Sequence, residues 1–250
     1  MREFQAFRYK DATYKICSSN SKELFSMLTS EIKQLRDELD NYIKLQPEFL
    51  KSLEPITVLQ SSPDSAIKMA EASRLCGIGP MAAVAGTIAQ IAAEKCSSFA
   101  HKLKVPEIII ENGGDLFILP IKEKNTVITG IFSGLSSKFS SLALKISPEK
   151  EGIAVCSSSS LMGHSLSLGN CDLSTVISKN ASLADAAATF GGNLVKTEAD
   201  LKPAAEKIVS IYGVEGVILI KNEQIAIAGN LPEIIKHKDP SGIKKITKTF

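Results

Sequence analysis

The longest regular pattern of hydrophobic positions lies near the start of the chain. Apolar side chains recur there every three or four residues, with charged side chains between them, at Leu24, Leu28, Ile32, Leu35, Leu39 and Ile43. This spacing predicts an amphipathic helix, and Pro47 limits its extent. Residues 3–9 and 13–17 are typical of two short strands, and the turn residues between them predict a hairpin.

A stretch without charged side chains follows at residues 75–93, and its length is about that of a membrane span. Its large apolar residues recur at three- and four-residue intervals, whereas alanine and glycine fill the other positions. We therefore expect a buried helix rather than a membrane span, starting near Pro80. A preceding helical segment opens at residues 62–64 and ends near Gly77.

The middle of the chain contains short hydrophobic runs separated by turn residues. Five of these runs predict a meandering sheet, at residues 105–110, 116–121, 126–132, 142–146 and 152–156. Two more helices, near residues 181–195 and 201–212, precede a last hairpin formed by residues 217–220 and 224–228. Because helices and strands are segregated along the chain, we predict an α+β fold with a mostly antiparallel central sheet packed against long helices.

The composition is that of an ordinary globular protein. Of 250 residues, 44% are hydrophobic and 22% are charged, and 29 basic against 27 acidic residues leave a net charge of +2. This near balance argues against a nucleic acid or an anionic membrane as a partner. We expect a single compact domain over residues 1–250, with an N-terminal sub-lobe at residues 1–60 and a ligand-binding core at residues 61–250.

The five cysteines are widely spaced, and none forms a Cys-x-x-Cys motif: Cys17, Cys76, Cys96, Cys156 and Cys171. This arrangement signals neither a disulfide framework nor a zinc site, and it suits reduced thiols. The first residues also lack the apolar core of a signal peptide. We therefore expect a cytoplasmic location.

Two loops offer candidate ligand-binding residues. The first is either a tight hairpin turn or a turn whose backbone N–H groups face an anion, and it comprises Asn112, Gly113, Gly114 and Asp115. The second follows the strand at residues 152–156 and is either a ligand-binding edge or a solvated serine loop, with candidates at Ser157, Ser158, Gly163, His164 and Ser165. No Gly-x-Ser-x-Gly elbow marks an activated nucleophile.

The helix predicted at residues 181–195 opens with an ambiguous segment. Ser182 and Asp185 have the spacing of a capping box, in which Asp185 reaches back to the free N–H groups of the first turn. Asp185 and Thr189 are also four residues apart, so a carboxylate and a hydroxyl share one helix face and could bind Mg²⁺ together with substrate phosphates. The residues alone favour capping and leave the metal site open.

The order of these segments resembles an uncharacterised family within the ApbE-like superfamily. The likeness covers most of residues 60–195, and its most specific element is the Gly-Pro-Met-Ala-Ala-Val-Ala-Gly run at residues 79–86. Well-known members of that superfamily are magnesium-dependent flavin transferases, which bind FAD and move FMN onto a threonine or serine of a target protein. The resemblance thus implies an ApbE-like fold, FAD or FMN as the ligand, Mg²⁺ as the cation and an acceptor protein as a partner.

The resemblance also implies roles for individual residues. Asp185 and Thr189 match the metal-binding helix of the family, and the glycine pair before Asp115 matches its flavin-positioning turn. His164 becomes the candidate catalytic residue, and the cofactor-binding candidates are Asn112, Gly113, Gly114, Asp115, Ser157, Ser158, Gly163 and Ser165. The chain departs from the family pattern directly after His164, where the expected acidic residue is absent. The fold is therefore more transferable than the activity.

Three functions are consistent with the sequence. The first is binding of a flavin or another phosphate-bearing small molecule, with or without transferase activity. The second, implied by the resemblance, is a role in anaerobic sulfide assimilation and homocysteine biosynthesis, for which a sulfur carrier needs an accessible thiolate at Cys76, Cys156 or Cys171. The third is a non-catalytic structural subunit, whose long helices would offer packing faces for a homo-oligomer.

Overall fold

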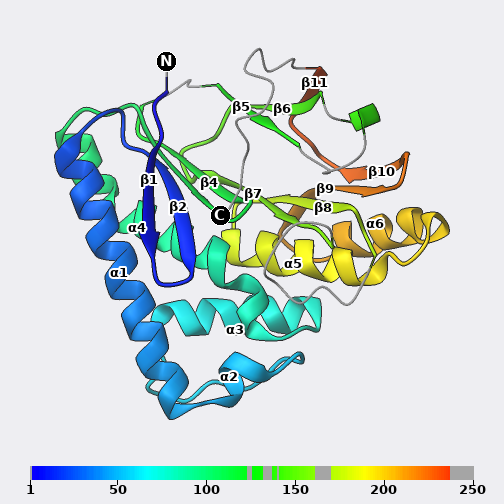
Figure 1. Ribbon diagram of the computed structural model, residues 1–250, viewed down its shortest axis with the longest axis horizontal. Coiled ribbons are helices and arrows are strands. Elements are labelled where there is room, and N and C mark those ends of the chain that lie inside the picture. The colour runs from blue at the N-terminus through cyan, green and yellow to red at the C-terminus, as the bar shows by residue number, and fades with distance from the viewer. Residues whose placement is uncertain (1, 123–125, 132–136, 140, 161–169, 237–250) are drawn as a thin grey trace.

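The structure is a computed structural model that describes residues 2–122, 126–131, 137–139, 141–160 and 170–236. Helices cover one face of a large antiparallel sheet, and a smaller sheet covers the opposite face (Figure 1). The architecture is α+β in a single compact unit, as the segregation of helices and strands along the chain predicts.

The large sheet has eight strands, and every neighbouring pair is antiparallel. Their order across the sheet is β1 (Gln5–Tyr9), β2 (Ala12–Cys17), β3 (Glu107–Asn112), β4 (Asp115–Pro120), β7 (Ile153–Ser158), β8 (Leu173–Ser178), β9 (Val214–Lys221) and β10 (Gln224–Gly229). The small sheet contains β11 (Glu233–Lys236), β6 (Leu142–Ile146) and β5 (Val127–Gly130).

The helices are long where the hydrophobic spacing is regular. They are α1 (Lys22–Leu45), α2 (Glu48–Lys51), α3 (Asp64–Cys76), α4 (Val84–Lys102), α5 (Ala181–Leu194) and α6 (Leu201–Val209), with short 3₁₀ turns at Pro80–Ala83, Ser137–Phe139 and Glu198–Asp200. Pro80 begins the turn that leads into α4, because a proline at this position gives up only an N–H that has no partner in the helix. Gly77 ends α3 in the left-handed conformation, with φ of 68°.

Alternation along the strands divides the core into two parts. On β3, Ile108 and Ile110 pack against the helices, whereas Ile109 packs against the small sheet. Every residue of β3 is buried, since this strand is covered on both faces. The large sheet therefore separates two hydrophobic cores, one on each face.

Most of the predicted elements are confirmed, including the first hairpin, the amphipathic helix α1 and the buried helix α4. The prediction of one meandering sheet is wrong, because β5 and β6 belong to the small sheet and β4 pairs with β7 instead. The sequence analysis also did not identify β8, β11 or the short helix α2. Within the described part of the chain, no single helix is long and apolar enough to cross a membrane; α3 and α4 reach that length only as a pair bent by 106°.

Helices α4 and α5 approach each other closely at Gly86. A Cβ atom at this position would lie 2.4 Å from the carbonyl oxygen of Ala181 and 3.0 Å from the Cβ of Asp185. Backbone atoms cannot give way as a flexible side chain can, so only glycine fits here. This contact fixes the position of Asp185 relative to the start of α4.

We expect Gly86→Ala to lower the free energy of unfolding by about 1–3 kcal/mol, because the added methyl group forces the two helices apart. Urea denaturation followed by circular dichroism measures the change. Gly130→Ala on β5 is the matched control, since a Cβ there meets no atom within 4 Å. An equal stability of the two variants would contradict the role given to Gly86.

Candidate functional site

The candidate residues gather at one end of the large sheet. The antiparallel register brings together the end of β3, the start of β4 and the end of β7. The start of α4 and the first turns of α5 cover this end from the helix side, where Asp185 contacts Gly86. The elements thus bring residues that are about 70 positions apart in sequence into one place.

The turn between β3 and β4 is a two-residue hairpin turn. Asn112 pairs with Asp115, and Gly113 and Gly114 form the turn with φ values of 66° and 109°. Positive φ at both positions explains why both residues are glycine. Of the two interpretations of this turn, the tight hairpin is therefore confirmed. The N–H of Gly114 donates to Oε1 of Glu111 at 3.2 Å, so this donor is already used within the turn.

Asp115 lies at the start of β4 with its side chain under the helices. It is 7% exposed, and its Oδ1 accepts a hydrogen bond from the backbone N–H of Ser157 at 3.2 Å. Burial raises the pKa of Asp115 well above its usual value, and the negative charge of Asp185 raises it further. The two carboxyl groups are therefore near enough for their charges to interact, in agreement with the packing of α5 against β4 and β7.

Asp185 comes to the same place from α5. It is also 7% exposed, and its Oδ2 accepts the backbone N–H of Gly86 at 2.9 Å. Burial raises the pKa of Asp185 to about 7, although the N–H groups of Gly86 and Ala85 oppose this effect. Asp185 thus satisfies N–H groups at the start of a neighbouring helix, where the helix dipole favours negative charge.

The interpretation of Ser182 and Asp185 as a capping box is wrong. The residue that caps α5 is Asn180, whose side chain accepts the N–H of Leu183 at 3.1 Å. Ser182 lies inside the helix, and its hydroxyl accepts a hydrogen bond from Thr87 at 2.7 Å. Because the helix begins earlier than the capping box requires, Asp185 faces α4 rather than its own first turn.

Cys156 completes the buried surroundings of the two carboxyl groups. The register of β4 and β7 places it opposite Asp115, and its Sγ contacts the carbonyl oxygen of Ala181 at 3.8 Å. Burial raises the pKa of Cys156 well above its usual value, and the charges of Asp115 and Asp185 add to this. The sequence analysis did not place Cys156 here, because only the strand pairing brings it next to Asp115.

The remaining described candidates lie around this centre. Thr189 is 8% exposed, one turn after Asp185 on α5, and Asn112 donates through Nδ2 to the carbonyl oxygen of Ala85 at 3.5 Å. The hydroxyl of Ser157 bonds to that of Thr175 at 2.9 Å. The hydroxyl of Ser158 is buried and has no hydrogen-bond partner among the described residues, which is unusual for a buried polar group.

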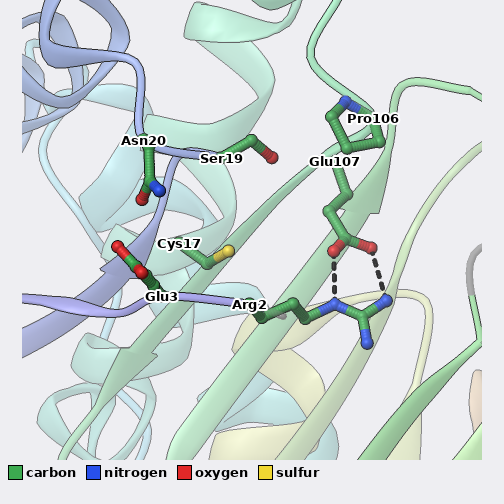
Figure 2. A pocket seen from close by; sticks show the side chains of 7 residues that line it. All are labelled: Arg2, Glu3, Cys17, Ser19, Asn20, Pro106 and Glu107. Carbon is green, nitrogen blue, oxygen red and sulfur yellow. Dashed lines mark hydrogen bonds and ion pairs between the residues drawn. The ribbon is translucent and has the colours of Figure 1, made fainter.

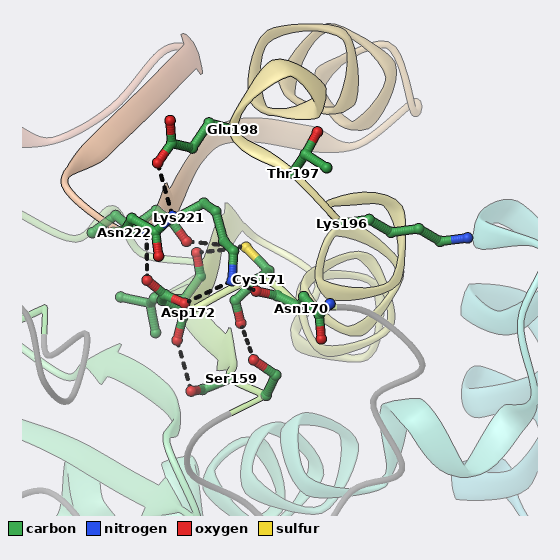
Figure 3. Close-up of polar contacts among 12 residues, drawn as sticks. Ser159, Asn170, Cys171, Asp172, Lys196, Thr197, Glu198, Lys221 and Asn222 are labelled. Atoms are coloured by element: carbon green, nitrogen blue, oxygen red, sulfur yellow. Dashed lines mark hydrogen bonds and ion pairs between the residues drawn. The ribbon is translucent and has the colours of Figure 1, made fainter.

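Gly163, His164 and Ser165 lie outside the described residues. The chain on either side of them is held together by hydrogen bonds, shown in Figure 3. Both the N–H and the hydroxyl of Ser160 donate to the carbonyl oxygen of Cys171, at 3.1 and 2.7 Å. Asp172 in turn accepts the N–H of Asn222 at 2.5 Å and lies 3.4 Å from Nζ of Lys221. These contacts tie the ends of β7 and β8 to the β9–β10 turn.

The two carboxyl groups and the Thr189 hydroxyl have the oxygen chemistry of hard-cation ligands, whereas the described residues contain no group of three or more His, Cys, Asp or Glu side chains placed to hold a metal ion. Two buried carboxylates repel each other, and in the described part of the chain neither forms an ion pair with a lysine or arginine. Hard cations such as Mg²⁺ prefer carboxylate and hydroxyl oxygens and keep open positions for substrate phosphates.

A cavity of about 450 Å³ lies away from the candidate site, at the opposite end of β2 and β3 (Figure 2). Its main charges are already paired with each other, since Arg2 bonds to both carboxylate oxygens of Glu107. Arg2 also donates to the carbonyl oxygen of Thr126 at 2.9 Å. The buried carboxylate of this cavity, that of Glu107, is thus neutralised by Arg2, whereas Asp115 and Asp185 have no such partner among the described residues.

All five cysteines are buried. Burial raises the pKa of Cys76 to about 12 and those of Cys96 and Cys171 to about 11. The pKa of Cys17 is also raised by burial. A reactive thiol needs a lowered pKa and access to solvent, so these side chains have the properties of core residues.

Comparison with known proteins adds relatives of similar length. The family model described as AbpE bacteria matches residues 10–210. A UPF0280 protein of Archaeoglobus fulgidus is 39% identical over 240 residues, which cover 94% of each chain. A UPF0280 protein of Methanococcus maripaludis strain C7 is 37% identical over 235 residues, which cover 92% of each chain.

The fold is similar to that of solved flavin transferases. A histidine-to-glycine mutant of the flavin transferase ApbE from Vibrio cholerae matches with a TM-score of 0.55 over 91% of this chain and 97% of that one, at 12% identity. The ApbE protein of Thermotoga maritima matches with a TM-score of 0.50 over 94% and 97%, also at 12% identity. At such low identity the likeness shows a common fold.

The buried carboxyl of Asp185 predicts a pH dependence of stability. Its pKa is about 7 in the folded chain against 3.8 in the unfolded chain, so between these values the folded state holds a proton that the unfolded state has lost. Raising the pH through this window should therefore lower the free energy of unfolding, on the order of a few kcal/mol, and above it the contribution stays constant. Urea denaturation in EDTA at a series of pH values measures the fall.

We expect Asp185→Asn to show a clearly smaller fall with pH, because the amide keeps the hydrogen bond from Gly86 and does not titrate. Thr189→Ala on the same helix is the control, and it should retain the fall seen in the unmodified protein. The same pH dependence in both variants would show that Asp185 is not the titrating group.

Proposed function

Because the chain belongs to the family described as AbpE bacteria, we propose that it binds a flavin nucleotide with the help of Mg²⁺ and uses FAD as the donor of an FMN group. The similarity of its fold to flavin transferases supports this proposal. The transfer would require an acceptor protein that offers a threonine or serine hydroxyl.

The observation that carries the proposal is the meeting of Asp115 and Asp185. One comes from the glycine turn of the sheet and the other from α5, and both are buried without a cationic partner among the residues described. Two like charges held together in a protein interior are destabilising unless a proton or a cation neutralises them. A bound divalent cation would remove this repulsion, and it would attract a diphosphate.

The residues around the pair have distinct proposed roles. Asp185 and Thr189 would hold the cation from α5, and Asp115 would face it from the sheet. The Gly113-Gly114 turn and Ser158 would contact the flavin nucleotide, with Ser157 and Asn112 beside them. When bound, Mg²⁺ would polarise the diphosphate of FAD and stabilise the charge that develops on the AMP leaving group.

The proposed catalytic residue is His164, with Gly163 and Ser165 on either side of it as ligand contacts. In the proposed reaction, the acceptor hydroxyl oxygen bonds to the phosphorus of the FMN group as the bond to AMP breaks. A neutral imidazole is suited to take the hydroxyl proton. The sequence lacks the acidic residue that the family pattern has after this histidine, so nucleotide binding is the part of the proposal that the structure supports best.

The structure does not favour the role in sulfur metabolism. A sulfur carrier needs an exposed thiolate, whereas Cys76, Cys156 and Cys171 are buried and their pKa values are raised.

We expect the purified protein to bind FAD more tightly in Mg²⁺ than in EDTA, because the cation bridges the carboxylates and the diphosphate. Asp185→Asn should weaken FAD binding in Mg²⁺ by roughly tenfold or more, the effect of losing one charge-assisted contact. Titration calorimetry or the quenching of flavin fluorescence measures both changes.

Asp64→Asn is the matched control, because this carboxyl is exposed at the first residue of α3. It should bind FAD as the unmodified protein does. Absence of FAD binding in both Mg²⁺ and EDTA would overturn the proposed function.

The buried cysteines give a further prediction. In the native protein at neutral pH, a thiol reagent should react at least a hundredfold more slowly than with a free thiol, roughly as expected for core cysteines that are exposed only by opening of the structure. In denaturant, all five thiols should react. One cysteine that reacts rapidly in the native protein would revive the sulfur-carrier hypothesis.

A further inference from the structure

The amide group of Gln90 on α4 faces the backbone at the start of α5. Its Oε1 accepts the N–H of Ala181 at 2.6 Å, and its Nε2 donates to the carbonyl oxygen of Lys179 at 3.4 Å. These two backbone groups lie on either side of Asn180, the N-cap residue of α5. Gln90 therefore holds both sides of the residue at which α5 begins.

This contact caps α5 from the neighbouring helix. The N–H of Ala181 is one of the first N–H groups of a helix, which have no partner within the helix itself. The side chain of Asn180 accepts another of them, that of Leu183, at 3.1 Å. The first turn of α5 is thus capped by two side chains, of which one belongs to α4.

Two further contacts join the same faces of the two helices. The hydroxyl of Thr87 bonds to that of Ser182 at 2.7 Å, and the N–H of Gly86 donates to Oδ2 of Asp185 at 2.9 Å. Residues three and four positions apart share a helix face, so these contacts and that of Gln90 lie in one line. Their order along α5 is the reverse of their order along α4.

We propose that Gln90 is a positioning residue for Asp185. By holding the start of α5 on α4, it keeps the carboxyl group against the N–H of Gly86, in the orientation in which Asp185 would face a cation. The inference rests on the proposed function for the cation, whereas the hydrogen bond from Gly86 can be measured without any ligand.

The packing of the two helices supports this role. A Cβ atom at Gly86 would lie 2.4 Å from the carbonyl oxygen of Ala181 and 3.0 Å from the Cβ of Asp185, so α5 cannot move closer to α4. The hydrogen bonds of Gln90 oppose movement in the other direction. Because Ala181 and Asp185 are one helical turn apart, a contact at the first residue sets the position of the carboxyl group.

The test replaces Gln90 by methionine, a side chain of similar length without an amide. In Gln90→Met, hydrogen exchange at the N–H of Gly86 should become roughly tenfold faster, because Asp185 no longer stays within hydrogen-bond distance. Exchange at the N–H groups of the central strand β9 should not change, and it reports any loss of global stability. NMR of the ¹⁵N-labelled protein in EDTA measures both.

The same variant tests the connection to the proposed function. The ratio of the FAD affinity in Mg²⁺ to that in EDTA should fall roughly tenfold, the effect of losing the support of a metal ligand. A general loss of structure would instead weaken binding equally in Mg²⁺ and in EDTA. Calorimetric titration gives the four affinities of the variant and the unmodified protein.

Gln34→Met on α1 is the matched control. Nε2 of Gln34 donates to Glu38 at 2.8 Å within α1, just as that of Gln90 donates to Glu94 at 2.7 Å within α4. This substitution removes the same kind of pair and should change neither measurement.

Two further variants sharpen the test. Gln90→Glu keeps an oxygen that can accept the N–H of Ala181, so it should retain the slow exchange at Gly86. Gln90→Ala removes the same amide without adding an apolar side chain and should behave as Gln90→Met does. The test therefore remains decisive if the methionine variant does not fold.

The outcomes separate this inference from the proposed function. Unchanged exchange at Gly86 in Gln90→Met and Gln90→Ala, or an equal acceleration in β9, would overturn the role of Gln90. Faster exchange at Gly86 alone, with the same Mg²⁺ dependence of FAD affinity, would support the positioning of Asp185 and contradict its role as a cation ligand. If the unmodified protein does not bind FAD, the proposed function is overturned, and the exchange at Gly86 still decides the role of Gln90.

Discussion

The burial of two neighbouring carboxyl groups is the constraint on which the site depends. Asp115 and Asp185 are each 7% exposed, and burial raises the pKa of both. The fold tolerates Asp185 because N–H groups at the start of α4 face it, and this contact exists only because Gly86 lets α5 approach within backbone distance. The close packing of α4 and α5 at Gly86 therefore sets both the hydrogen bond of Asp185 and the pKa of its carboxyl group, so a change in this packing would alter both.

The sequence predicted those parts of the fold that depend on local spacing. The apolar stripe from Leu24 to Ile43 identifies α1, and the pair Gly113 and Gly114 identifies a tight turn, because each pattern reflects the geometry of a single element. Strand order cannot be predicted from local spacing. β4 pairs with β7, although β5 and β6 lie between them in the sequence and belong to the small sheet. β8 was not predicted because its serines and threonine are buried together with its hydrophobic residues, so the strand lacks the usual alternation of polar and apolar positions.

The candidate site was predictable in part. Asp115 and Asp185 were named from motifs, and the structure brings them together, whereas Cys156 and Gly86 join them only through tertiary contacts that no spacing records. The capping box failed for a specific reason: Asn180 begins the helix, so Ser182 falls inside it and bonds to Thr87. A motif of four residues cannot show where its helix starts, and the neighbouring strand and turn decide that.

A carboxylate has two oxygen atoms, so under the proposed function Asp185 would cap α4 and also hold a cation. Oδ2 of Asp185 accepts the N–H of Gly86, which fixes the orientation of the group. Fixing a metal ligand through a second contact lowers the entropy lost on binding and orients the first contact. Under the proposed function, a bound cation would favour the ionised form of the buried carboxyl pair, so proton release and cation binding would be linked at this site.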